Sequence, residues 1–452
     1  MDLIYLPLVV DENKQALNVE KQLAVALVRA TGRDLKIKAA QVLGWPITLI
    51  KNEKNGGYLI FDQTLSLETK FHFTILQEYD KILTTLQNSK NESEILSLLK
   101  SFKWYLTKGV EEVSFRGLVD TDLTPLFLTG SPQIPLSLMQ IEATQFDLDM
   151  LLQDLNSREN QILNNVSAIE EVISKVTTIV TILKGKRAEE RKQIEDKYDQ
   201  LISAKNEELK QKVVELKKQL EGELSNEAKK LYGKLAEIEV LIAKSELDKE
   251  AGFVTDKDVE ALNVMKSKYI NELNSSITSI KNKYKIEVQK IVNEINLLNQ
   301  QKQKEIEVVN SKIAELDNIL QSVTNQLNSV KNSCEQELNA LRSVYKRAPY
   351  NNEKIDIVIP FLVVKDYTDR VFVVGPQVYK YKKSFIRFFR KEPYDISEDL
   401  LNLSNFASAL SYKYSQTISD NLKQIRQLVE KGLEELYEDG WNIRRRVEEY
   451  YV

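Results

Sequence analysis

The stretch Lys380–Lys391, called here the basic-aromatic segment, contains the residues of this sequence best suited to binding chemistry. It holds six basic and four aromatic side chains among twelve residues, and no acidic one. Lysine and arginine bind phosphates, and aromatic rings stack on unpaired bases, so the mixture favours a nucleic-acid surface. The residues predicted to make these contacts are Lys380, Lys382, Lys383, Arg387, Phe388, Arg390 and Lys391.

The sequence of the basic-aromatic segment is compatible with two other interpretations. Phe385, Phe388 and Phe389 are also suited to insertion into an anionic membrane surface. Alternatively, the segment is the start of a strand and a helix, with its aromatic side chains in the core and its cations in solvent. The cluster Arg444–Arg446 either extends the basic surface or forms one face of a helix, because Glu448 and Glu449 follow it.

Residues that could perform catalysis are few, and their surroundings favour structural roles. His72 lies between two phenylalanines, which favours a packing or surface position. Cys334 falls on an apolar heptad position, which favours a small core residue over a nucleophile. One histidine and one cysteine exclude a histidine-rich or cysteine-rich metal site within a single chain. We therefore predict no catalytic residue, no metal, no cofactor and no enzymatic activity.

A nucleotide site is also not expected from this sequence. The chain contains no GxxxxGK motif, whose glycine-rich loop and lysine would hold phosphates. The nearest approximation, Gly375–Lys380, has the wrong number of glycines, and Pro376 removes a backbone donor.

Two long stretches with an apolar heptad repeat dominate the middle of the chain. They lie on either side of a short non-helical patch, Ala251–Asp256, and the midpoint between them is about residue 247. Apolar residues spaced alternately by four and three drive helices to pack along a seam, so we predict an antiparallel coiled-coil hairpin at 136–345 with its tip near 251–256. The seam residues are Ile162, Val166, Ile169, Ile173, Val176, Val180 and Leu183 in the first stretch, and Val309, Ile313, Leu316, Leu320, Val323, Leu327, Val330 and Cys334 in the second.

The seam becomes polar after Leu183, where Arg187, Glu190 and Lys197 occupy core positions. Folding the chain at about residue 247 places this zone opposite roughly 297–307, which is also polar. The pattern predicts either a flexible joint or a loosely packed region without a role.

The remaining residues, 1–135 and 346–452, are expected to form one split α/β head, so that the predicted fold class is α+β. Turn residues between apolar runs predict two β-hairpins, one around Gly56 and one over 355–374. Pro7 predicts that the strand in Leu3–Val10 lies near a sheet edge. Residues 67–106 are expected to be mostly helical, with Asn91 or Ser93 as a cap. Ser397, with Glu398 and Asp399, is expected to start a helical tail that is broken near Gly440.

A helical hairpin inserted into a split head resembles, in architecture only, the structural-maintenance-of-chromosomes (SMC) ATPases. We therefore predict a non-enzymatic, SMC-like architectural protein that lacks ATPase motifs and binds or bridges chromosomal DNA. The alternative is a tethering adaptor for a protein complex, a ribosome or a membrane surface. An enzyme that carries a coiled-coil arm is a third possibility.

Composition limits the setting of this function. The formal net charge of −4 provides no overall basic field, so a nucleic-acid site has to be local. The longest apolar runs have the length of strands, and the first residues lack a signal-peptide pattern, so we expect a cytoplasmic protein without a transmembrane segment. Protein partners or self-association through the rod or the head are expected, which makes the chain a candidate oligomer.

Overall fold

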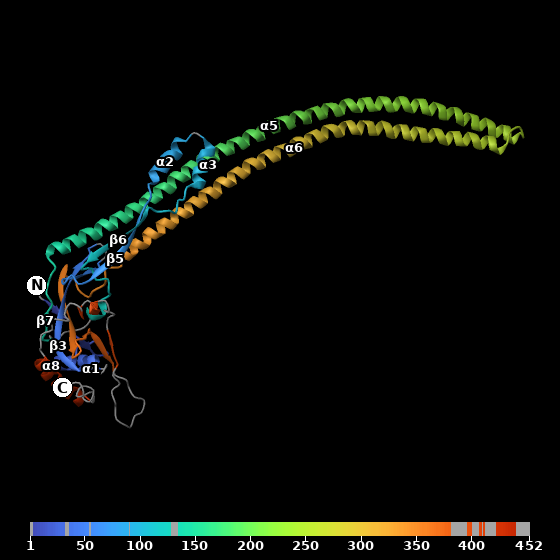
Figure 1. Ribbon diagram of the computed structural model, residues 1–452. Coiled ribbons are helices and arrows are strands. Elements are labelled where there is room, and N and C mark those ends of the chain that lie inside the picture. Colours follow the sequence, from blue (N-terminus) through green and yellow to red (C-terminus); the bar gives the residue numbers. More distant parts are fainter. Residues whose placement is uncertain are drawn as a thin grey trace, which may run out of the picture. The chain divides into compact units, whose positions relative to one another are not determined.

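The computed structural model describes residues 3–31, 36–53, 56–89, 91–127, 134–380, 396–399, 406–408, 410–411 and 422–439. Their fold is mixed α+β, as predicted, with two long helices, α5 and α6, that pack against each other (Figure 1). The chain divides into two compact units. The first unit comprises residues 1–82, 103–172 and 325–452, and the second comprises 83–102 and 173–324. The predicted boundaries of the head and the hairpin stay a prediction.

The first unit is built on a six-stranded sheet with strands from distant parts of the chain. Its central pair is β3 (Ile37–Lys51) and β8 (Lys354–Asp366), which run antiparallel. Both predicted β-hairpins are present, because β4 (Tyr58–Asp62) pairs with β3 and β9 (Val371–Val374) pairs with β8. The short strands β1 (Ile4–Tyr5) and β7 (Ser137–Leu138) complete the sheet by pairing parallel with β8 and β3.

Alternation along β8 divides its side chains between two cores. Successive side chains of a strand point to opposite faces. Ile357, Ile359 and Phe361 therefore enter a core with Trp45, while Leu362 and Val364 enter a core that contains α1 (Val19–Thr31) and α8 (Leu422–Glu438). Both faces are thus covered, which explains why this strand is almost continuously apolar.

Two smaller sheets complete the strands that the structure describes. β5 (Glu68–Ile75) pairs with β6 (Gly109–Arg116), and β10 (Gln377–Lys380) lies between β2 (Val9–Val10) and β11 (Ile396–Asp399). The helical tail expected to start at Ser397 is wrong over β11, because Ser397–Asp399 is strand and pairs with β10. The expectation of helix from residue 67 onward is wrong over β5. Phe73 is buried whereas Lys70 and His72 are exposed, and this two-residue alternation favours a strand over a helix.

Short helices follow this strand. They are α2 (Tyr79–Asn88), α3 (Glu92–Ser101) and, after β6, α4 (Thr124–Phe127). Asn91 caps α3 as predicted, because its side chain accepts a hydrogen bond from the Ser93 amide at 3.0 Å. In the second unit, α3 is attached to the long helices by ion pairs from Glu92 to Arg187 and from Lys100 to Glu315.

The long helices α5 (Gln145–Glu250) and α6 (Asp256–Arg342) run antiparallel. In the second unit Lys302 contacts Asp199 at 2.6 Å, and in the first unit Lys331 contacts Glu170 at 2.6 Å. The mean residue number of each pair is about 251, so the register centre differs by about four residues from the predicted 247. The predicted centre is the midpoint between the two apolar runs. It is displaced because each run ends where its seam becomes polar, and the two runs do not end at opposite positions.

Hydrogen bonds in the turn between α5 and α6 cap the end of α5 and the start of α6. Gly252 adopts a left-handed φ of 80°, which glycine tolerates, and the Phe253 amide bonds the Asp248 carbonyl at 2.9 Å. At the start of α6, the Asp258 carboxylate accepts hydrogen bonds from the Thr255 amide and hydroxyl at 2.9 and 2.6 Å. These bonds hold the pKa of Asp258 below its usual value.

The polar zone of the seam contains hydrogen-bonded side chains inside continuous helices. Tyr198 is buried, and its hydroxyl donates to the Glu305 carboxylate at 2.7 Å. Arg187 bonds both Glu190 and Glu92. Tyr198, Arg187 and Glu190 thus have polar partners, although the buried Arg187 Nε has none among the described residues. Lys197, predicted at a core position, is exposed, and its neighbour Tyr198 is buried instead. Flexibility at the joint stays a prediction.

Candidate functional site

The predicted nucleic-acid residues begin where strand β10 ends. Lys380 is the last residue of β10, and its backbone lies opposite Ile396 of the antiparallel strand β11. Lys382, Lys383, Arg387, Phe388, Arg390 and Lys391 lie outside the described residues, as does the cluster Arg444–Arg446. The basic-aromatic segment thus follows a strand that is paired on both sides.

Contacts with the core fix the strand β10. The Gln377 amide donates to the Leu8 carbonyl at 2.9 Å, and Val378 lies opposite Val10. Tyr379 is buried among the side chains of the core that contains α1 and α8. The side-chain amide of Gln377 is fully buried and has no hydrogen-bond partner among the described residues. The start of the segment is therefore held by packing and by main-chain bonds.

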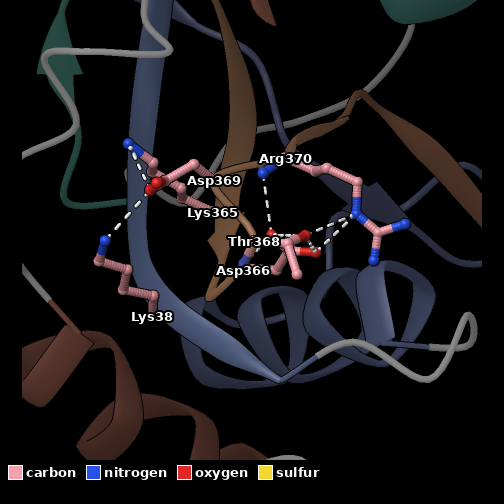
Figure 2. A network of polar contacts seen from close by, with 6 residues as sticks. All are labelled: Lys38, Lys365, Asp366, Thr368, Asp369 and Arg370. Atoms are coloured by element: carbon pink, nitrogen blue, oxygen red, sulfur yellow. Dashed lines mark hydrogen bonds and ion pairs between the residues drawn. The ribbon is translucent and has the colours of Figure 1, made fainter.

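A network of polar contacts occupies the turn that connects β8 to β9 (Figure 2). The buried Asp366 carboxylate accepts hydrogen bonds from the Thr368 and Arg370 amides at 2.8 Å and from the Arg370 Nε at 2.9 Å. The exposed Asp369 carboxylate receives the ammonium groups of Lys38 and Lys365, each at 3.1 Å.

The electrostatics of this network indicate a structural turn. Burial raises the pKa of Asp366, but hydrogen bonds from Thr368 and Arg370 outweigh burial and leave the pKa below its usual value. Hydrogen bonds from Lys38 and Lys365 lower the pKa of Asp369. Both carboxylates are thus ionised at neutral pH, so neither can serve as a general acid there. Asp369 also has a φ of 60°, which these contacts stabilise.

The two residues weighed as catalytic candidates occupy different environments. His72 is 64% exposed on β5, with its Nε2 3.3 Å from a Glu112 carboxylate oxygen. Cys334 is fully buried, and desolvation raises the pKa of its thiol to about 11. The thiolate is the reactive form of cysteine, so Cys334 is poorly suited to nucleophilic attack at neutral pH. Its position agrees with the predicted core role.

The described residues contain no group of three or more histidine, cysteine or acidic side chains placed to hold a metal ion. Among the same residues, none of the helices combines the length and apolar character that crossing a membrane requires.

Exposed apolar side chains lie at the hairpin turn and were not predicted from the sequence. Phe253 is 82% exposed and Leu247 is 67% exposed. Between Lys244 and Glu260 the sequence has three lysines and six carboxylates, so these apolar side chains lie in acidic surroundings. A phenylalanine in a non-helical patch flanked by charges was the available signal.

Comparison of the chain with protein-family models, with curated proteins and with solved structures finds no match.

Proposed function

We propose that this chain is a non-enzymatic architectural protein that binds or bridges chromosomal DNA. The α5–α6 hairpin supports this proposal: a pair of packed helices of 106 and 87 residues is suited to spacing and bridging. The basic-aromatic segment is the proposed DNA contact. In this proposal the chain is SMC-like in having a helical hairpin, and it acts without ATP hydrolysis.

Binding through the basic-aromatic segment has two separable components. Each lysine or arginine that contacts a phosphate releases counterions, so binding weakens as salt rises. Aromatic rings stack only on bases that are unpaired, so stacking favours single strands. Charge and stacking can therefore be removed independently.

The test measures binding of labelled single-stranded and duplex DNA by fluorescence anisotropy over a series of salt concentrations. Replacing Lys382, Lys383, Arg387 and Arg390 by glutamine should lower affinity for both DNAs and flatten the salt dependence. Phe388→Ala should weaken binding to single strands more than to duplex. The matched control replaces Lys217, Lys218, Lys281 and Lys285, which are exposed on α5 and α6, by glutamine.

The control should retain affinity, because it removes the same number of charges outside the proposed contact. Equal loss of affinity in the control would indicate non-specific attraction. Unchanged affinity in both charge variants would refute the DNA contact at this segment.

The exposed side chains at the hairpin turn favour a second function, that of a tethering adaptor. Phe253 and Leu247 offer apolar area in acidic surroundings, which suits a basic protein surface better than an anionic membrane. A photo-crosslinker at residue 253, used in the native cells, should give one discrete adduct that Leu247→Ser abolishes. A diffuse set of adducts that is insensitive to Leu247 would exclude an adaptor site at the turn.

A further inference from the structure

Strand β6 is an open edge among the residues that the structure describes. β5 and β6 form a separate two-stranded sheet (Figure 1). The Gly117 amide donates to the Leu67 carbonyl. This bond shows which residues of β6 direct their backbone groups towards β5 and which direct them away. In an antiparallel ladder alternate residues point their backbone groups away from the partner strand. On β6 these residues are Val110, Glu112, Ser114 and Arg116.

Contacts of β5 agree with this assignment of inward and outward backbone groups. Thr74, opposite Val110, directs its amide to the Glu337 carboxylate and receives the Asn165 side chain on its carbonyl. The outer edge of β5 is thus covered at this point. No hydrogen bond between described residues reaches the outward backbone groups of β6, and its outward residues are exposed. An open edge of this length is a template for another strand.

The exposed face of the β5–β6 sheet alternates in charge. Glu68 lies opposite Arg116, Lys70 opposite Ser114 and His72 opposite Glu112. The other face carries the buried side chains of Phe73 and Phe115, together with Glu111, which forms an ion pair with Arg158 at 2.7 Å. A strand added beside β6 would therefore extend a sheet that already has one buried face and one charged face.

We propose that β6 pairs antiparallel with β6 of a second copy, with Ser114 opposite its own counterpart. This register sets Glu112 opposite Arg116 of the second copy, and the twofold axis repeats the pair. Glu68, Arg116, Glu112 of the second copy and His72 of the second copy then form one row across four strands. Charges of opposite sign are therefore neighbours in this row from Glu68 to Arg116 and from Arg116 to Glu112 of the second copy.

Charge excludes the competing register that centres on Glu112. That register sets the two Glu112 side chains opposite each other, and like charges directly opposite destabilise a sheet. A register centred on Val113 sets Glu112 opposite Ser114 and leaves Arg116 opposite Val110, so it forms no ion pair. The register centred on Ser114 is the one in which both charged residues of the edge find opposite charges. The contact is small, so the dimer should be weak and concentration-dependent.

Analytical ultracentrifugation of the full chain, from about 1 µM to about 1 mM, tests for this dimer. Glu112→Arg and Arg116→Glu should each weaken it about tenfold or more, because each turns two attractive pairs into two repulsive ones. The double variant E112R/R116E restores opposite charges and should restore association. A monomer at every concentration would overturn the proposal and leave the edge to an extended segment of another protein.

Disulfide cross-linking between single introduced cysteines tests the register of the proposed strand pair. Ser114→Cys should cross-link two chains under mild oxidation, since residues opposite each other in such a ladder have Cα atoms about 5.5 Å apart. Glu112→Cys is the matched control, because its two copies would lie about 13 Å apart along the strands. Cross-linking through residue 112 or through Val113→Cys, without cross-linking at 114, would refute this register. Cys334 is buried and should not interfere.

These outcomes are independent of the proposed DNA contact. Glu112 and Arg116 lie outside the basic-aromatic segment, so a monomeric variant still reports DNA affinity per chain. Loss of the dimer and loss of the DNA contact can therefore be told apart.

Discussion

At the scale of single residues, the carboxylate of Asp62 organises the end of strand β4. It is fully buried and accepts hydrogen bonds from the Trp45 indole at 2.7 Å and the Thr64 amide at 2.8 Å. The amides of Ser66 and Leu67 donate to its second oxygen at 2.8 and 3.0 Å. This one side chain thus joins β3, β4 and the turn that leads into β5.

Asp62→Ala should destabilise the protein by about 2–4 kcal/mol, because several buried donors lose their acceptor at once. Asp11→Ala is the matched control: Asp11 also accepts bonds from two amides two and four residues later, but in an exposed loop. The control should cost less than about 1 kcal/mol. Urea unfolding measures both values, and equal losses would contradict the role of burial.

Burial of Cys334 predicts a pH dependence of stability. Its folded pKa of about 11 exceeds the value of about 8.5 in an unfolded chain, so the unfolded state loses this proton first. The contribution to the free energy of unfolding is therefore complete below about pH 8.5 and declines as pH rises towards 11. Cys334→Ser should flatten this decline. Thiol labelling should be slow in the native protein and fast in urea, and fast native labelling would contradict the burial of the thiol.

At the scale of elements, helices α1 and α8 approach closely at a glycine. A Cβ atom at Gly432 would lie 2.1 Å from the Glu20 carbonyl oxygen, so the two helix backbones need the absence of a side chain there. The ion pair between Lys431 and Glu20, at 2.7 Å, lies beside this contact.

Gly432→Ala should therefore separate α8 from α1 and destabilise the first unit, by about 1–3 kcal/mol as for other overpacked sites. Gly222→Ala is the matched control in α5, where a Cβ would meet nothing within 4 Å. The control should stabilise by up to about 1 kcal/mol, because alanine favours the helix. Opposite signs in thermal unfolding are expected, and stabilisation by both variants would contradict the close contact.

The sequence predicts elements well where one repeat continues over many turns. The heptad seam identifies the long helices, and the apolar runs around Gly56 and over 355–374 identify two β-hairpins. Prediction fails at β5 (Glu68–Ile75), because this strand is only eight residues long and two amphipathic helices, α2 and α3, come soon after it. The register of the long helices also needs cross-helix ion pairs, such as Lys302 with Asp199, which no single-helix pattern specifies.

The candidate sites show the same difference between composition and placement. A run of lysine, arginine and phenylalanine can be recognised from letters alone, as in the basic-aromatic segment. The open edge of β6 cannot be recognised from the sequence. It depends on the folded arrangement, in which β5 is the one described strand that pairs with β6. Exposure of Leu247 likewise depends on which helix face the partner helix covers.

At the scale of the whole molecule, the proposed dimer and the proposed DNA contact would act together if both hold. The open edge of β6 and the strand β10 that precedes the basic-aromatic segment belong to the same compact unit. A dimer formed through β6 would therefore carry two such segments in one particle. Two linked weak sites bind a long polymer more tightly than either alone, because the second contact is intramolecular. If both proposals hold, the dimer would carry two proposed DNA contacts and could bridge two DNA segments.

Both termini contribute to the fold in a way that a cut in the chain can test. β3 pairs with β8 along most of their lengths in the first unit, and α5 packs on α6. A protease site inserted after Gly252, in the turn between α5 and α6, should give two fragments that stay together. Co-elution at the size of the uncut chain is the expected result on gel filtration. Unfolding in urea followed by dilution should recover the complex only when both fragments are present, because the strands of each then regain their partners. Separate elution of two folded fragments would show that each terminus folds by itself, in contradiction to the pairing of β3 with β8.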